Sequence, residues 1–167
     1  MKKALVVGAL LFLVGVAASA SIGVGAKLLN GNVPFIIGEF GGEKLSVELG
    51  VGLQSISILG LFNWTTIWYS GVTRLAFPVG AFAPYVGIGG IGVSIILSSD
   101  VLEGSESLSA LGLTGEGGLR YSFEELGFPL RISGGASITW IPVSGDVEDA
   151  GIGGVGMGWH IGAVVPF

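Results

Sequence analysis

The strongest constraint on folding is a strict two-residue alternation in residues 44–54, KLSVELGVGLQ. Every odd position is apolar, and the even positions are lysine, serine, glutamate, glycine or glutamine. Successive side chains of a β-strand point to opposite faces, so as a strand this stretch has one apolar and one polar face. A helix would place the polar groups around its whole circumference. The same division recurs in residues 111–123 and 130–140.

Low charge makes a membrane the expected surroundings of these strands. Only 11% of the residues are charged, against about 25% in an average soluble domain. Residues 49–73 and 75–99 contain no charged residue, so each is also long enough for a transmembrane helix of about 20 residues. Glycine, however, recurs at spacings of two or three and costs about 1 kcal/mol at each position of a helix interior. Together with the alternation, this favours membrane-spanning strands over helices.

The first 20 residues have the parts of a secretory signal peptide. Two lysines follow the first methionine, an apolar run occupies residues 4–16, and a small-residue motif, Ala-Ser-Ala, ends the segment. The alternative is an uncleaved anchor helix, but the apolar run is short for a membrane span. We therefore predict a cleaved signal peptide over residues 1–20 and one β-barrel domain over residues 21–167.

Turn signals divide the barrel domain into eight predicted strands. Asn30-Gly31 is a strong tight-turn signal, and Gly41-Gly42 marks the next turn. A strand edge cannot remain unpaired in lipid, so the sheet must close on itself. We predict an all-β fold, an eight-stranded antiparallel up-and-down transmembrane β-barrel. Its predicted strands cover residues 22–29, 33–40, 44–56, 66–77, 85–97, 109–123, 129–141 and 153–167.

The connections and the aromatic residues predict an orientation. Turns after the second, fourth and sixth strands are short, whereas those after the fifth and seventh are longer and acidic, as expected for periplasmic turns and outer loops. The acidic outer loops are candidates for binding divalent cations. Aromatic residues fall near strand ends, as in interfacial girdles. The periplasmic set is Phe40, Phe77, Phe82, Tyr85, Tyr121, Phe123, Phe128 and Phe167, and the outer set is Trp64, Trp68, Tyr69 and Trp140.

The last predicted strand ends on an aromatic residue preceded by apolar residues at every second position, namely Trp159, Ile161, Ala163, Val165 and Phe167. This pattern resembles the C-terminal signal by which bacterial outer-membrane barrels are recognised by their assembly machinery. With the signal peptide and the eight strands, the chain resembles the small OmpA-like and OmpX-like barrels of Gram-negative bacteria. The resemblance implies insertion into outer-membrane lipid and contact with the barrel-assembly machinery.

Alternation also places the charged residues, because lysine or arginine facing the lipid midplane costs about 2–4 kcal/mol. We expect a lumen charge network with ion pairs between Glu48 and Arg74 and between Glu39 and Lys44, and with His160 near Arg131. Its predicted members are Lys27, Glu39, Lys44, Glu48, Arg74, Glu116, Arg120, Arg131 and His160. Ten glycines are also expected to face inward, namely Gly50, Gly52, Gly90, Gly92, Gly112, Gly118, Gly154, Gly156, Gly158 and Gly162.

The functional expectation is a structural or interaction role with a lumen filled by polar side chains. Because so many glycines are expected to line the lumen, a narrow pore or small-ligand channel is the alternative, and an excess of basic lumen residues would favour anions. A lipid-modifying enzyme is a distant third reading. One histidine and no cysteine cannot build a usual metal site, so we expect no cofactor. No His-x-Ser pairing accompanies His160, which disfavours a nucleophile activated by this histidine. The net charge of -5 disfavours nucleic acid.

Overall fold

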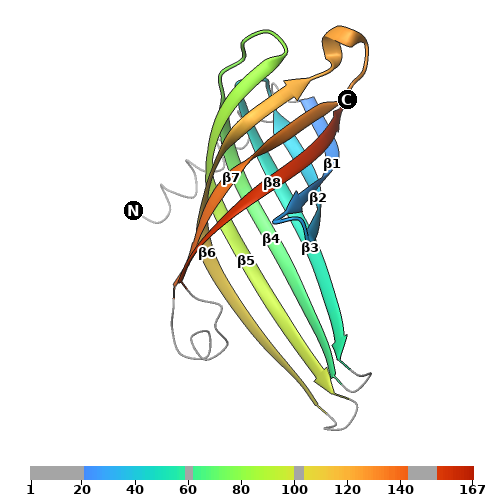
Figure 1. Cartoon of the computed structure of the whole chain (residues 1–167), viewed down its shortest axis with the longest axis vertical. Helices are drawn as coiled ribbons and strands as arrows, with labels where there is room; N and C mark the ends of the chain where they lie inside the picture. Colours follow the sequence, from blue (N-terminus) through green and yellow to red (C-terminus); the bar gives the residue numbers. More distant parts are fainter. Residues whose placement is uncertain (1–20, 59–61, 100–103, 143–153) are drawn as a thin grey trace, which may run out of the picture.

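The protein is an eight-stranded antiparallel barrel in the computed structural model, which describes residues 21–58, 62–99, 104–142 and 154–167. Each strand pairs with the next along the chain, and β1 pairs with β8, which closes the barrel (Figure 1). The predicted fold class is therefore confirmed. The signal peptide prediction lies outside the described residues. The strands are β1 (Ser21–Leu29), β2 (Val33–Gly41), β3 (Leu45–Ile58), β4 (Phe62–Ala76), β5 (Phe82–Ser99), β6 (Gly104–Ser122), β7 (Arg131–Ile141) and β8 (Gly154–Pro166).

A short 3-10 helix, η1 (Glu124–Leu126), lies in the connection between β6 and β7. Within the part of the chain that the structure describes, no helix has the length and apolar character needed to cross a membrane.

The strands differ greatly in length. β1 and β2 have 9 residues each, whereas β5 has 18 and β6 has 19, and β3 to β6 extend well beyond the others at one end of the barrel (Figure 1). The sequence predicts a loop over residues 97–107, but β5 and β6 stay paired as far as Ser99 and Gly104. A strand that has left the lipid can carry polar residues on both faces. The polar composition therefore marks the membrane boundary and not the end of the strand.

The tight turn predicted at Asn30-Gly31 joins β1 to β2. Both residues have positive φ, 52° for Asn30 and 73° for Gly31, and the flanking residues Leu29 and Val33 pair across the hairpin. Asparagine and glycine tolerate this left-handed conformation better than other residues, which explains why the chain reverses here.

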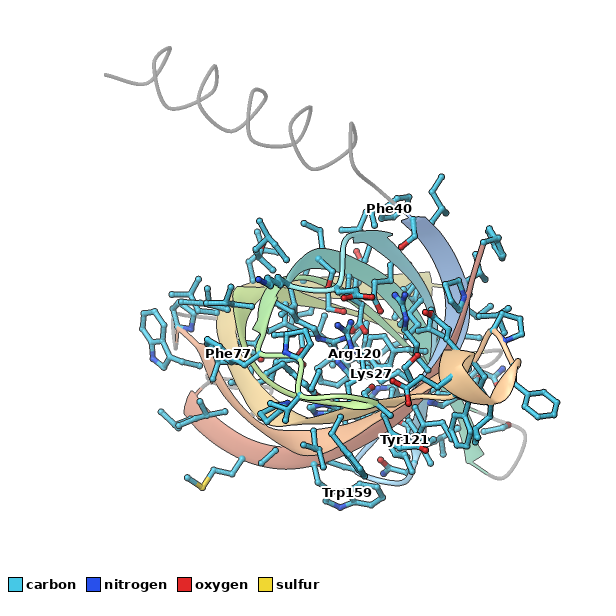
Figure 2. The ribbon with its side chains drawn as sticks, turned by 90° about the horizontal axis from the view of Figure 1, so that it is seen from above. Lys27, Phe40, Phe77, Arg120, Tyr121 and Trp159 are labelled. Atoms are coloured by element: carbon cyan, nitrogen blue, oxygen red, sulfur yellow. The ribbon has the colours of Figure 1, made fainter. Side chains whose placement is uncertain are left out.

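The outward face of the barrel is apolar on all eight described strands. Exposed examples, one from each strand, are Ile22, Ile36, Val51, Leu75, Ile88, Leu113, Ile138 and Ile161. The side chains of Phe40, Phe77, Tyr121 and Trp159 project outward, whereas Lys27 and Arg120 lie inside the ring of strands (Figure 2). This surface is the opposite of that of a water-soluble domain and matches the lipid-facing band of a transmembrane barrel.

The pairing register fixes the tilt of the strands. Starting from Leu111 and following paired residues once around the barrel, the path returns to β6 at Tyr121, which is 10 residues (121 − 111) along the strand. With eight strands about 4.8 Å apart and a rise of about 3.3 Å per residue, this offset corresponds to a tilt of about 40°, which lies in the range of transmembrane barrels.

Three aromatic residues expected in the girdles lie on the inward face of the sheet instead. One is Trp64, which shares the face of the buried Thr66 on β4 and donates from Nε1 to its hydroxyl oxygen at 2.8 Å. Tyr85 is buried inside the barrel, and Trp68 packs against the two apolar clusters of the interior. On β5 the odd positions point inward, so the expectation that Gly90 and Gly92 line the lumen is wrong. Gly92 lies under the outward ring of Tyr69, where an added Cβ would meet the ring at 1.9 Å. The lipid-facing Val86 and Ile88 fix this parity because they alternate with Tyr85.

The interior has two parts. In the half nearer the outer loops, one apolar cluster contains Val93, Ile95, Ala110 and Ile141. A second cluster, of Val33, Phe35, Ile37 and Val164, continues from there toward the short turns, since Val164 pairs with Arg131. Buried charged residues occupy the middle and the half nearer the short turns. The barrel therefore has a polar site enclosed by its own wall.

Candidate functional site in the barrel lumen

Four buried charged residues from four strands form a closed ring of ion pairs, which we call the charge cluster. Lys27 of β1 lies between Glu48 of β3 and Glu116 of β6, with its Nζ 2.9 Å from Glu48 Oε1 and 3.0 Å from Glu116 Oε2. Arg74 of β4 completes the ring, with Nη1 2.5 Å from Glu48 Oε2 and Nε donating to Glu116 Oε1. Two positive and two negative charges balance, so the charge cluster is neutral.

Strand register explains how the charge cluster forms. Glu48 pairs with Val72, and Arg74 pairs with Ser46, so Glu48 and Arg74 are diagonal neighbours on the inner face. The ion pair expected between them is present, although they are not directly opposite. Lys27 and Arg74 reach Glu116 across the interior, at sequence separations of 89 and 42 residues. A single charge buried here would be costly, and mutual pairing removes most of that cost.

Tyr85 and His160 extend the charge cluster. The Tyr85 ring centroid lies 5.1 Å from Arg74 Cζ, and its hydroxyl is 2.5 Å from His160 Nε2. His160 is only 2% exposed, and the same nitrogen is 4.0 Å from Glu116 Oε2. The expected position of His160 near Arg131 is wrong, because His160 pairs with Gly135 on β7 and therefore lies deeper in the barrel.

A second ion pair lies toward the short-turn end. Arg120 Nη1 is 2.9 Å from Glu39 Oε1, and Arg120 Nη2 donates to the Glu43 backbone oxygen at 2.6 Å. The expected partner of Glu39, Lys44, is exposed in the turn between β2 and β3 and does not face the lumen. Two-residue alternation does not apply to turn residues, which is why that expectation failed.

Arg131 lies at the mouth of the barrel near the short turns. Its Nε and Nη2 donate to the half-exposed Glu124 Oε1 at 3.0 and 2.8 Å. Arg131, Glu124 and Arg120 line a small cavity of about 60 Å³ at this mouth. Among the described residues, the buried part of the lumen therefore contains three basic and three acidic side chains, without the excess of basic groups that would favour anions.

Two further cavities lie on the outer-loop side of the charge cluster. One of about 30 Å³ is lined by Lys27 and Glu116 together with hydroxyl and apolar side chains. A larger one of about 250 Å³ shares part of this lining, and none of the described residues in its wall is charged. The cavity at the short-turn mouth shares no lining residue with the 30 Å³ cavity. The charge cluster and the Arg120–Glu39 pair lie between these two cavities.

The remaining expected site residues are on β8 and in the outer loops. Trp159, Ile161 and Val165 are exposed and Ala163 is half-buried, all on the outward face, and the Phe167 backbone N–H donates to the Ile22 oxygen at 2.8 Å. The acidic loop residues Asp100, Glu103, Asp146, Glu148 and Asp149 lie outside the described residues, so binding of divalent cations stays a prediction. In the described ranges no three acidic or histidine side chains gather into a metal site.

Comparison with known proteins supports the fold. No family model and no curated protein matches the chain. Solved structures do, each over 89% of this chain. The N-terminal barrel domain of Pseudomonas aeruginosa OprF matches over 96% of its chain, with a TM-score of 0.60 and 14% identity. Yersinia pestis Ail, the attachment invasion locus protein, matches over 97% of its chain, with a TM-score of 0.55 and 19% sequence identity. Neisserial surface protein A matches over 94% of its chain, with a TM-score of 0.61 and 12% sequence identity.

These three proteins are small outer-membrane barrels of eight strands, so the resemblance expected from the sequence is confirmed. At these identities the likeness concerns the fold, and the side chains of the lumen have to be interpreted from this chain itself.

Proposed function

We propose that the protein is an integral barrel of the bacterial outer membrane with a structural or interaction role, and that its lumen does not conduct. The observation that carries this proposal is the charge cluster. Its four side chains come from four strands and pair with one another inside the barrel. An eight-stranded barrel has an interior just wide enough for side chains to fill.

Energetics support a permanently closed state. An ion would have to displace at least one of the paired groups of the charge cluster, and an unpaired buried charge costs several kcal/mol. The ring also offers each carboxylate two cationic partners, so breaking one contact leaves the others intact. Tyr85 packs on Arg74 and holds His160, which adds bulk beside the ring.

A narrow pore is the second candidate, and the cavities on both sides of the charge cluster favour it. In that case water and ions would pass between Lys27 and the wall. An enzymatic role has weaker support, since in the described part of the chain His160 is held by a tyrosine and not by a serine nucleophile.

Ion flux into vesicles separates the closed barrel from the pore. The protein reconstituted into liposomes is expected to admit potassium no faster than protein-free liposomes do. The matched positive control is the double variant Glu48→Ala with Arg74→Ala, which removes one neutral pair and shortens two side chains in the ring. We expect this variant to admit potassium measurably faster. Flux through the unaltered protein equal to that of the variant would favour the pore.

We also propose that the outward residues of β8 and Phe167 are recognised by the barrel-assembly machinery. The Phe167 ring is 74% exposed, and its ordered contact is a backbone hydrogen bond that any residue can make. Phe167→Ala is therefore expected to leave the refolded barrel folded, at a cost of about 1–2 kcal/mol for the lost contact of the ring with the membrane interface. In cells, the same variant is expected to accumulate in an unassembled form.

The measurement is the heat-modifiable, folded fraction in outer-membrane preparations, compared with urea unfolding of the refolded protein. Val79→Ala, another exposed apolar residue near the short-turn end, is the control and should assemble normally. Normal assembly of Phe167→Ala would contradict the proposed role of this residue.

A further inference from the structure

The barrel wall has a notch on the outer-loop side. Pairing between β1 and β8 stops at Leu29 and His160, and pairing between β2 and β3 stops at Phe35 and Gly52. β8 and β3 both continue past these points, to Gly154 and Ile58. Among the described residues, no strand pairs with β8 residues 154–158 on the β1 side. Figure 1 shows the short β1–β2 hairpin ending well before its longer neighbours.

Specific contacts end the ladder at this point. The Asn30 backbone N–H donates to the Trp159 oxygen at 2.9 Å, and the Asn30 side-chain oxygen accepts from the Trp159 N–H at 2.9 Å. Pro34 has no N–H to donate to the β3 edge. The sequence of the hairpin therefore determines both edges of the notch.

The cavity of about 250 Å³ lies at this notch. Its wall includes the lumen-facing Trp68, Ile91 and Ile141, and also Val155 and Met157, which point outward from β8. Val155 is 69% and Met157 84% exposed, on the face that carries the apolar band. The cavity thus joins the apolar interior of the barrel to its lipid-facing surface.

Glycines on β8 keep this cavity open. A Cβ built on Gly156 would meet no atom within 4 Å, and the position does not have a left-handed backbone. Close packing therefore does not explain the glycine, in contrast to Gly158, where the same atom would lie 2.5 Å from the Asn30 side chain. A larger residue at position 156 would instead project into the empty space of the cavity.

We propose that this cavity holds an acyl chain of a membrane lipid, which enters sideways through the notch while its headgroup stays at the membrane surface. An apolar cavity of about 150 Å³ already binds benzene, so about 250 Å³ accommodates several carbons of a chain. Among the described residues the wall contains the polar Asn30, Ser137 and Thr139 but no charged residue, and the charge cluster beyond it is already neutral. A fatty-acid carboxylate would find no unpaired cation there, which favours an esterified chain.

This inference rests on membrane insertion, as proposed above, and photolabelling tests the two separately. The protein is reconstituted in phosphatidylcholine vesicles containing a phosphatidylcholine with a diazirine at the end of one acyl chain. After irradiation, labelled residues are identified by mass spectrometry. Labels on outward residues such as Ile36 and Val51 report insertion, and labels on Trp68 and Ile91 report occupation of the cavity.

The matched variants are Gly156→Leu, which fills the cavity, and Gly115→Leu, which adds the same side chain at an outward glycine where an added Cβ would make only ordinary contacts, 3.6 Å from Ile138 Cγ2. We expect labels on Trp68 and Ile91 in the unaltered protein and in Gly115→Leu, and their loss in Gly156→Leu with outward labels retained. Circular dichroism and heat-dependent gel mobility verify that both variants fold.

Three outcomes would overturn the inference. Labels confined to outward residues would contradict the site and leave membrane insertion standing, whereas no labels at all would contradict insertion. Lumen labels that persist in Gly156→Leu would place the chain elsewhere. Lumen labelling by a free diazirine fatty acid but not by the phospholipid would contradict the lipid source.

Discussion

Glu116→Gln is expected to lower the free energy of unfolding by about 3–5 kcal/mol. Glu116 is the acidic group that both Lys27 and Arg74 contact, and all three side chains are buried. Its neutralisation leaves one excess positive charge inside the barrel. A buried charge without a partner is far more costly than an intact ion pair is stabilising, so the loss exceeds that of an ordinary surface pair. Urea unfolding in lipid vesicles, followed by tryptophan fluorescence, measures the change.

Two control variants test whether the loss of stability comes from the unpaired buried charge. Glu124→Gln removes a half-exposed pair with Arg131 and is expected to cost about 0–1 kcal/mol. The double variant Glu116→Gln with Lys27→Met restores neutrality and should recover a large part of the loss, which shows energetic coupling between the two residues. A Glu116→Gln protein as stable as the Glu124→Gln protein would contradict the role assigned to the charge cluster.

Arginine at position 36 is expected to destabilise the barrel by about 2–4 kcal/mol, whereas arginine at position 79 should change stability by no more than about 0.5 kcal/mol. Ile36 and Val79 are equally exposed, at 74% and 73%. Ile36 lies on the outward face in the middle of β2, where an arginine would meet lipid. Val79 lies in the short turn between β4 and β5, where it would meet water.

Comparing these two arginine variants tests whether the outward face of the barrel lies in lipid. Unfolding free energies of Ile36→Arg and Val79→Arg in the same vesicles supply the measurement. Equal and small effects at the two positions would mean that the apolar outer face does not lie in lipid, since an exposed arginine on a water-facing surface is almost neutral.

The sequence predicts the number of strands and their faces well, because lipid on one side and a packed lumen on the other impose a period of two. It predicts the strand ends less well. β5 and β6 stay paired through Ser98, Ser99 and Ser105, where the sequence is no longer apolar at every second position. Hydrogen bonding between strands does not depend on side-chain polarity, so pairing persists after the hydrophobic signal has ended.

The lumen was predictable in composition but not in its contacts. Lys27, Glu48, Arg74 and Glu116 were all expected inside, and so they are. Which of these side chains meet depends on the offset between paired strands around the closed barrel. This offset brings residues from distant strands to the same height along the barrel axis.

Two further features of the lumen differ from what the sequence predicts. Glu39 contacts Arg120, which is 81 residues away, and not the nearby Lys44. The aromatic ring of Tyr85 and its place near a strand end predict a girdle position, whereas Tyr85 is buried in the lumen. The sequence does not determine which face of β5 is inward, because branched apolar residues occupy both faces, with Val86 and Ile88 outward and Ile91 and Val93 inward.

Single-channel recording in planar bilayers tests the closed lumen most sharply, because it detects openings too rare to raise the average flux into vesicles. The protein is first shown to be folded by β-type circular dichroism and heat-dependent gel mobility. We predict no discrete current steps from the unaltered protein, and steps from the Glu48→Ala, Arg74→Ala double variant. Reproducible steps from the unaltered protein would contradict a lumen closed by the charge cluster.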